Sequence, residues 1–178
     1  MIITDLKKTL TLEQGGAQPY LPMLSFDIHT VCHDVAQSFF PALRLPINLR
    51  FCKNNTLACI CSTQDRADIF VHVLLNDGST PIQVLRHIVA HELLHLVVPS
   101  AAIDGRQVMH TDESWRYEAR VAPDRSRSWA WIMLNLHSCI LMDKKNERTL
   151  VKRNWKRLWG TPRCSWELCN SIVEGSLY

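Results

Sequence analysis

Features of membrane and secreted proteins are missing from this 178-residue sequence. No uninterrupted apolar run approaches the roughly 20 residues that span a bilayer. The residues Met1–Lys8 lack the basic head, apolar stretch and small-residue cleavage site of a secretory signal. Internal repeats and low-complexity segments are absent as well. We therefore expect one compact core in a cytoplasmic or nucleoid-associated protein, with no membrane as a partner.

Cysteines are present, but not in a pattern that holds a structural zinc ion or a disulfide framework. Their number is odd, and no second pair stands at the spacing of a zinc ribbon. Disulfides are rare in the cytoplasm, and free cysteine is among the most buried residue types. We expect reduced, mostly buried thiols at Cys32, Cys52, Cys59, Cys61, Cys139, Cys164 and Cys169.

Acidic residues are scarce in the C-terminal part of the chain. Residues 143–163 contain eight Lys or Arg and two acidic residues, so the net charge of this segment is +6. Since the net charge of the whole chain is +3, the rest of the chain carries −3. A weakly acidic body with a basic appendage indicates an anionic partner for the C-terminal part.

The first half of the sequence predicts a packing helix followed by short strands. Apolar residues recur at helical spacing from Ser25, which can cap the helix, to Phe39. The period then changes to two, and strands are predicted at 46–52, 57–62 and 68–75. Three short strands in succession favour an antiparallel meander.

The second half predicts helices. Thr80, Pro81 and Gln83 combine a capping residue, a proline at the first helical position and a capping-box partner. The helix that they begin is expected to end near Val97. The remaining expected elements are a loop at 100–109, a helix of about ten residues from Thr111 and a final long helix at 124–141. These elements predict an α+β fold.

The helix expected at 80–97 carries His91-Glu92-Leu93-Leu94-His95 near its end. Residues four apart lie on one face of a helix, about 6 Å apart along the axis, so two imidazoles can converge on one ion. Glu92 points to another part of the cavity wall, where it can act as general base on a metal-bound water. We predict that His91 and His95 are metal ligands and that Glu92 is catalytic.

A third ligand is expected at His110, with fourteen residues between it and His95. Zinc accepts imidazole nitrogens in tetrahedral geometry, and a catalytic site needs three protein ligands and a fourth position for water. The intervening loop is long enough to return His110 to the ion, so we predict one catalytic Zn²⁺. The alternative is a chance motif, which this composition produces about 0.01 times per chain.

Around this motif the sequence resembles the SprT-like metallopeptidases and the related bacterial YgjP-type proteins. The resemblance rests on 91–96, on 110–115 and on Pro123-Asp124, and it covers about residues 46–141. It implies a minimal zincin domain, in which a small, mainly antiparallel sheet packs on the active-site helix with flanking helices. It also implies that zinc is held by the three histidines named above, with Glu92 as base.

The function that this resemblance implies is that of a zinc-dependent metalloendopeptidase acting on a protein or peptide substrate. SprT-like members act on proteins bound or crosslinked to DNA, which makes DNA a candidate partner. Two features depart from the family. The stretch between His95 and His110 is longer than in YgjP-type proteins, and the paired-cysteine zinc ribbon of some SprT proteins is absent.

The resemblance places a metallopeptidase domain at 1–142, with its core at about 25–142. Residues 143–178 then form a basic, Trp-containing segment docked on the core. Basic side chains neutralise phosphates and aromatic rings stack on bases, so this segment is a candidate nucleic-acid contact. A basic helix that packs on the core and leaves a solvated charged face would have the same composition. The candidate contacts are Lys152, Arg153, Trp155, Lys156, Arg157 and Trp159.

Four further residues are candidates for supporting the reaction. His87 lies one turn before the first ligand and about 12 Å from the second along the helix axis, so it is expected to orient a ligand or to pack. Glu113 is assigned to helix capping or to a hydrogen bond with a ligand. Tyr117 and His72 are candidate oxyanion donors, and the peptide is expected along a strand edge at 68–75.

Two functions from different classes are consistent with these patterns. The first is the zinc metalloendopeptidase. The second is a nucleic-acid-binding or regulatory interaction protein, in which the zinc site is mainly structural and the basic, Trp-containing segment carries the function. The sequence indicates no oligomeric state.

Overall fold

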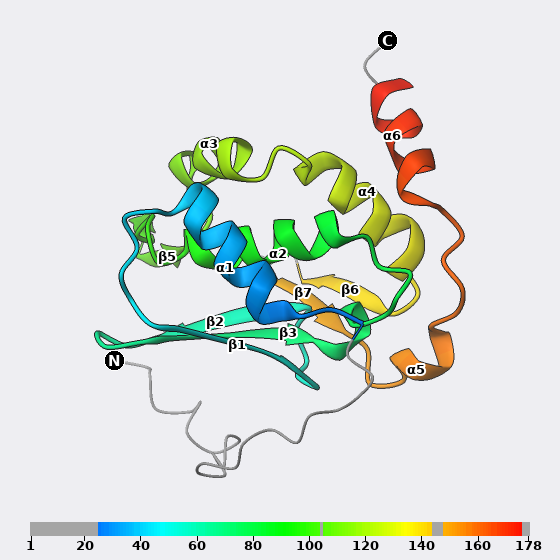
Figure 1. Cartoon of the computed structure of the whole chain (residues 1–178), viewed down its shortest axis with the longest axis horizontal. Coiled ribbons are helices and arrows are strands. Elements are labelled where there is room, and N and C mark those ends of the chain that lie inside the picture. The colour runs from blue at the N-terminus through cyan, green and yellow to red at the C-terminus, as the bar shows by residue number, and fades with distance from the viewer. Residues whose placement is uncertain (1–24, 104, 144–147, 176–178) are drawn as a thin grey trace.

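A computed structural model describes residues 25–103, 105–143 and 148–175. The elements in chain order are α1 (Ile28–Phe39), β1 (Ile47–Cys52), β2 (Ala58–Ser62), β3 (Ala67–His72), the 3₁₀ helix η2 (Val73–Leu75), α2 (Ile82–Leu94), β4 (Ala101–Ile103), β5 (Arg106–Val108), α3 (Asp112–Val121), α4 (Arg125–Leu136), β6 (Ile140–Asp143), β7 (Arg148–Val151), α5 (Trp155–Leu158) and α6 (Trp166–Gly175). The expected class, α+β with small and mainly antiparallel sheets, is confirmed (Figure 1). None of the helices in these described ranges has the length and apolar character needed to cross a membrane.

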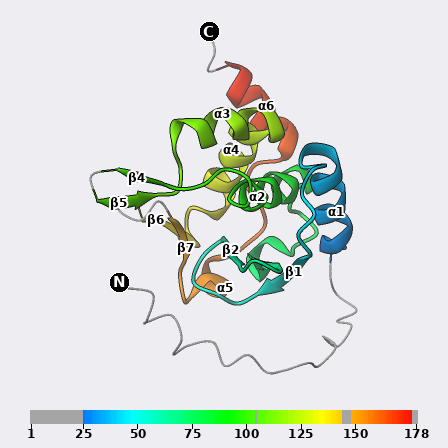
Figure 2. The ribbon, with the colours of Figure 1, turned by 90° about the vertical axis from the view of Figure 1, so that its left-hand side faces the viewer.

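Helix α2 lies at the centre of the domain. The three-stranded sheet lies below it, α1 beside it, and α3 and α4 above it, as the end-on view of α2 in Figure 2 shows. Nine of the thirteen α2 residues are buried, as expected for a helix enclosed on nearly all sides. Burial of a leucine such as Leu85 or Leu93, both fully buried, contributes roughly 1.5–3 kcal/mol to the free energy of folding. This enclosure determines where the C-terminal end of α2 lies.

The three-stranded sheet has the order β1–β3–β2, so the expected meander is wrong. Strand β3 is central, parallel to β1 and antiparallel to β2. The cause is a pairing between distant segments: the Leu57 N–H donates to the Thr149 carbonyl at 2.8 Å, and the Val151 N–H donates to the Asn55 carbonyl at 2.9 Å. Because the connection between β1 and β2 pairs with β7, it does not form the tight turn of a hairpin. The segment 68–75 therefore supplies no free edge along β3, which has neighbours on both sides.

Two helices begin near their expected positions but with different caps. The carboxylate of Asp27, not Ser25, caps α1 by accepting two backbone N–H groups at 3.1 and 3.3 Å. A carboxylate suits this position because it also offsets the positive end of the helix dipole. Helix α2 begins after Pro81, and the buried Thr80 hydroxyl does not cap it.

The helix expected at 124–141 is shorter, because its last residues form a strand. Helix α4 ends at Leu136, and β6 then pairs with β7 as an antiparallel hairpin, with Ile140 opposite Val151. The expected boundary between residues 142 and 143 falls inside this hairpin. Since β7 also pairs with the segment before β2, the basic segment begins within the sheet structure of the domain.

The chain before α6 docks on α4 through the buried side chain of Asn135. Its Oδ1 accepts the N–H groups of Arg163 and Cys164 at 2.8 and 2.9 Å. Its Nδ2 donates to the carbonyls of Cys164 and Trp131 at 3.0 and 3.1 Å. The amide thus uses both donors and both acceptor positions, which is what a buried asparagine requires.

Replacing Asn135 by alanine is expected to lower the free energy of unfolding by roughly 3 kcal/mol, because the buried N–H and carbonyl of Cys164 and the part-buried N–H of Arg163 lose their partner. Urea unfolding followed by circular dichroism measures the change. Asn154→Ala is the matched control, since Asn154 is exposed and its side chain makes no capping bond to α5. Equal stabilities for the two variants would contradict the importance of this contact.

Candidate metal centre

Three histidine side chains meet at the C-terminal end of α2. The ligand atoms of His91, His95 and His110 all lie within 4.8 Å of one another. Each pair of ring centroids is 5.0 Å apart. Although α2 ends at Leu94, His95 keeps right-handed helical angles, φ −62° and ψ −16°, so it stays on the same face as His91. These three residues could hold a metal ion.

A hairpin of β4 and β5 returns the chain from α2 to His110. Ala101 pairs with Val108, so the two ends of this hairpin lie side by side. Gly105 turns it with φ +72°, a left-handed angle that favours glycine. The hairpin projects at the left of Figure 2, away from the helices. The long stretch between His95 and His110 is therefore taken up by a paired hairpin rather than by the expected loop.

The spacing of two ring nitrogens and the neutral state of His95 suit metal binding. Nε2 of His91 and Nε2 of His110 are 3.1 Å apart. Two imidazole nitrogens on one tetrahedral zinc ion lie roughly 3.3 Å apart, given Zn–N bonds of about 2.0–2.1 Å. Burial, with the charges of His91 and His110, lowers the pKa of His95 to about 4, so its ring is neutral near pH 7. Three imidazoles suit a transition metal better than magnesium or calcium.

Helix α3 positions His110 from the other side. The His110 ring stacks on Trp115, with centroids 5.2 Å apart and planes 27° apart. The guanidinium of Arg125 lies 4.8 Å from the Trp115 ring centroid. The Thr111 hydroxyl accepts the Ser114 N–H at 3.2 Å and caps α3 directly after His110, as the sequence predicts. Because Thr111 directly follows His110, the cap that begins α3 also fixes the backbone position of His110.

Glu118, which sequence reasoning missed, connects the metal ligands to α3 and α4. The Nδ1–H of His91 donates to its Oε1 at 2.8 Å, and the Nε–H of Arg125 donates to its Oε2 at 2.7 Å. The side chain is 1% exposed. Burial alone would raise the pKa of Glu118, but the hydrogen bond with His91 and the charge of His91, with smaller contributions from the charges of His87 and Arg125, lower it to about 2. With Nδ1 engaged as a donor, His91 presents Nε2 to the ion, and such carboxylate partners fix ligand orientation in zinc sites.

The sequence alone gives little signal for Glu118, because two of the three residues on the buried face of α3 are polar or charged. The buried residues of α3 are Ser114, Glu118 and Val121, spaced at i, i+4 and i+7 on one helical face. A glutamate on the inward face of a helix next to a metal ligand needs a partner, because an unpaired buried charge is costly. Glu113 is exposed in the first turn of the same helix. The buried carboxylate is therefore the one on the inward face of α3, not one in its acidic first turn.

Glu92 occupies a buried position next to His91. Its side chain is 6% exposed, and burial raises the pKa of its carboxyl to about 7 although the charge of His91 opposes the shift. Helix α2 packs on the edge strand β2. Besides burial, the negative charge of Glu92 raises the pKa values of Cys59 and Cys61 on that strand. A carboxyl with a pKa near 7 can accept and release a proton at neutral pH.

Two of the four candidate supporting residues lie near the histidines. The His87 ring centroid is 6.4 Å from that of His91 and 6.0 Å from that of Trp129. Burial lowers the pKa of His87 to about 4, so it is a neutral packing partner of the ligand helix. Glu113 lines an open hollow together with His110, but it is exposed, and the Ser114 side chain, not Glu113, completes the capping box of α3.

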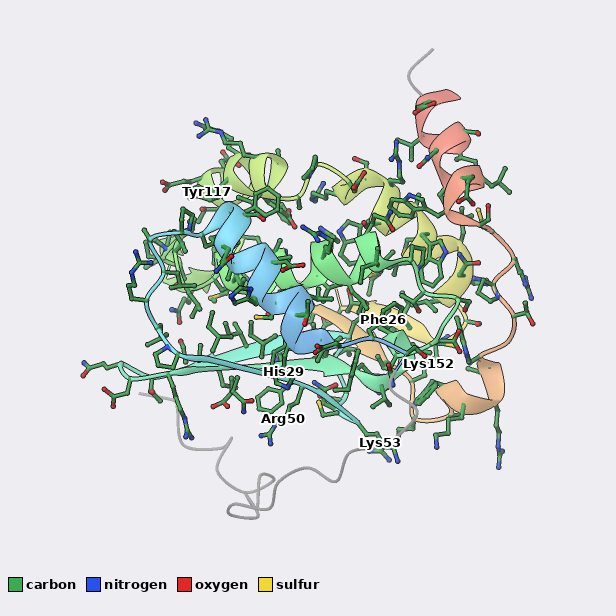
Figure 3. All side chains as sticks on the ribbon, in the orientation of Figure 1. Phe26, His29, Arg50, Lys53, Tyr117 and Lys152 are labelled. Carbon is green, nitrogen blue, oxygen red and sulfur yellow. The ribbon has the colours of Figure 1, made fainter. Side chains whose placement is uncertain are left out.

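The two candidate oxyanion donors make their contacts elsewhere. Tyr117 stacks on Phe40 with centroids 6.3 Å apart and lies at the end of α1 in Figure 3. His72 meets the Trp155 ring edge-on at 5.3 Å, and its Nδ1 accepts the Leu74 N–H at 2.9 Å. The structure thus brings Glu118, rather than Tyr117 or His72, into contact with the candidate metal ligand His91.

The tryptophans of the basic segment are used in packing. Trp155 packs on His72, and the Trp159 Nε1–H donates to the Asp77 carboxylate at 3.3 Å. The remaining candidate contacts, Lys152, Arg153, Lys156 and Arg157, are exposed. Two of these four are engaged locally: the Lys152 ammonium donates to the Ser138 carbonyl at 2.8 Å, and the Lys156 ammonium lies 5.9 Å from the Trp155 ring centroid. The segment presents positive charge but keeps Trp155 and Trp159 against the domain.

No protein-family model matches this chain, and no curated protein or solved structure matches it. The centre is therefore interpreted from its own chemistry.

Glu118→Gln is expected to weaken zinc binding by about 10- to 100-fold, because a neutral amide holds the His91 ring less firmly and supports its basicity less. Competition with a chromogenic chelator measures the affinity. Glu113→Gln is the matched control on the same helix and is expected to bind zinc as the wild type does. Unchanged affinity in Glu118→Gln would remove this carboxylate from the metal site.

Glu92 is expected to make the stability of the metal-free protein depend on pH. Its pKa is raised from 4.5 to about 7, so the folded state is penalised as pH rises from 4.5 through 7, and the penalty is constant above that range. The metal-free Glu92→Gln variant should exceed the wild type in stability by roughly 3 kcal/mol at pH 8 and equal it at pH 4. Urea unfolding in the presence of a chelator tests this, and a difference independent of pH would contradict it.

Proposed function

We propose that this chain is a zinc-dependent metalloendopeptidase of the SprT-like type. The observation that carries the proposal is the convergence of His91, His95 and His110 next to the buried carboxyl of Glu92. Among the described residues this ligand group has three members, which leaves one tetrahedral position for water or substrate. Structural zinc sites are closed by four protein ligands, so the geometry favours catalysis over the structural alternative.

The roles of the protein residues follow from their environments. When bound, zinc polarises a peptide carbonyl and lowers the pKa of a water molecule to about 7. Glu118 keeps His91 in the tautomer whose Nε2 is directed toward His110. Glu92 accepts the proton of the attacking water and delivers it to the amine of the departing peptide. Its buried position keeps its affinity for that proton high.

The free edge of β2 is the place where we propose that the peptide lies. Helix α2 packs on β2, and within the described sheet β2 pairs with β3 alone, so its other edge presents unpaired backbone groups. Main-chain hydrogen bonds to such an edge give affinity with little sequence preference. This position replaces the edge expected at 68–75.

An open hollow of about 510 Å³ adjoins His110. It is lined by Pro99, Ser100, Ala101 and Val108 of the β4–β5 hairpin region and by His110, Thr111, Asp112 and Glu113 at the start of α3. A substrate side chain that enters this hollow would lie beside a metal ligand. The hairpin therefore forms part of the proposed substrate cleft.

Action on DNA-associated proteins is a narrower form of the same proposal. Its support is the resemblance to SprT-like enzymes and the exposed charge of Lys152, Arg153 and Arg157. The alternative function, nucleic-acid binding through base stacking, gains no support, because Trp155 and Trp159 contact other residues of the protein.

The proposal predicts that Glu92→Gln abolishes peptide hydrolysis while zinc stays bound. Loss of a positioned general base lowers the rate by about 10²–10⁴-fold. Cleavage of an unfolded protein such as reduced casein by the zinc-loaded enzyme gives the rate, and elemental analysis gives the zinc content.

The control is Glu167→Gln, purified in parallel, which should keep both zinc and activity because Glu167 is exposed on α6, outside the proposed cleft. Hydrolysis at the wild-type rate by zinc-loaded Glu92→Gln would exclude Glu92 as the base. Absence of hydrolysis by the zinc-loaded wild type, with peptides and with DNA-bound proteins alike, would overturn the endopeptidase itself.

A further inference from the structure

Two buried thiols meet where α6 joins the rest of the domain. Sγ of Cys164 and Sγ of Cys169 are 3.2 Å apart, and the two residues are 5% and 0% exposed. A disulfide bond has an S–S length of about 2.05 Å, so the two sulfurs need to approach by only about 1.2 Å. The metal centre does not use this pair.

Both cysteines are held in place by their main chains. The Cys164 N–H donates to the Asn135 Oδ1 at 2.9 Å and its carbonyl accepts the Asn135 Nδ2 at 3.0 Å. The Cys169 N–H donates to the Ser165 carbonyl at 3.1 Å in the first turn of α6. These main-chain hydrogen bonds hold Cys164 in the loop before α6 and Cys169 in the first turn of α6, so that their side chains face each other.

Helix α6 packs on α4 but buries little of its own surface. Cys169 is its buried residue, while Leu168 and Ile172 are 50% and 43% exposed. Its contacts with α4 include Arg127, which lies 5.5 Å from the Trp166 ring centroid and 3.6 Å from the Glu174 carboxylate. In Figure 1, α6 extends from the domain at the upper right. A covalent link at Cys169 would therefore change how firmly this helix is attached.

We propose that Cys164 and Cys169 form a dithiol site that a peroxide oxidises to an intrachain disulfide, which ties the start of α6 to the loop held by α4. The thiolate of Cys164 attacks one peroxide oxygen, the O–O bond breaks, and one water leaves after protonation, giving a sulfenic acid. The Cys169 thiol then attacks that sulfur, the S–O bond breaks, and a second water leaves. In total, two thiols lose two protons and two electrons, and one hydrogen peroxide takes them up to become two waters.

Cys164 reacts first because of its position. It lies in the loop before α6 and is the less completely buried of the two. Burial, with the neighbouring Cys164 thiol, raises the pKa of Cys169 to about 12, so this residue supplies little thiolate. Peroxide reaches the pair when α6, which buries little of its own surface, opens locally, a motion that costs less than global unfolding.

The short distance between the Cys164 and Cys169 sulfurs, rather than their exposure, favours a disulfide at this pair. Cys59 and Cys61 are more accessible than Cys164 and Cys169. They stand two residues apart on β2, a separation of about 6.6 Å along a strand, and closing a disulfide there would break the pairing with β3. They provide an internal comparison within the same molecule.

The test uses the full chain, treated with hydrogen peroxide, alkylated in denaturant and digested with trypsin. No Lys or Arg follows Arg163, so Cys164 and Cys169 fall in one peptide, 164–178, whereas Cys59 and Cys61 fall together in 54–66. We expect peptide 164–178 to be about 2 Da lighter and closed to alkylation until a thiol reductant is added. Peptide 54–66 should not contain an internal disulfide.

Two variants and a stability measurement complete the test. Cys169→Ser should leave a sulfenic acid on Cys164 that dimedone traps, and Cys164→Ser should leave Cys169 unmodified. The oxidised wild type should show a Tm about 2–8 °C above the reduced protein, an increase absent from both variants. Full alkylation of both cysteines in a peroxide-treated protein that remains folded would overturn the proposal, even if neither variant folds. An unchanged Tm after disulfide formation would overturn the attachment of α6.

Discussion

The geometry of the candidate metal centre depends on the two hydrogen bonds that the buried carboxylate of Glu118 accepts. Glu118 lies on α3, accepts a hydrogen bond from His91 on α2 and another from Arg125 on α4, and so joins three helices at one point. An unpaired charge in this position would be strongly destabilising, so the helices must pack with both partners in place. The contact that orients the ligand also holds the helices together.

Two buried carboxylates near the same histidine have opposite acidities. Glu118 has two cationic or donor partners, which lower its pKa to about 2 against the effect of burial. Among the described residues Glu92 has no comparable partner, and burial raises its pKa to about 7. Pairs of acids whose environments separate their pKa values divide structural and proton-transfer roles. The first residue is suited to hold a charge permanently, and the second to exchange a proton.

The hairpins explain how a short chain builds this centre. The β4–β5 hairpin absorbs the long stretch after His95 and returns His110 to α2. The β6–β7 hairpin pairs with the segment before β2, and β2 lies at the edge of the sheet, packed against α2. The basic segment that was expected to dock on the core thus forms part of the sheet structure next to this edge. Its tryptophans add packing area rather than a stacking surface.

Features that depend on neighbouring residues could be read from the sequence. The spacing of His91 and His95, the start of α3 after Thr111 and the α+β class follow from helical and strand periodicity, which is local. The sequence also identified His110 as the third histidine. Only the tertiary structure decided that Glu118 is the partner of His91, that β3 is the central strand and that Asn135 clamps the chain before α6. Each of these is a contact between segments far apart in the chain, and their pairing is determined by packing rather than by local pattern.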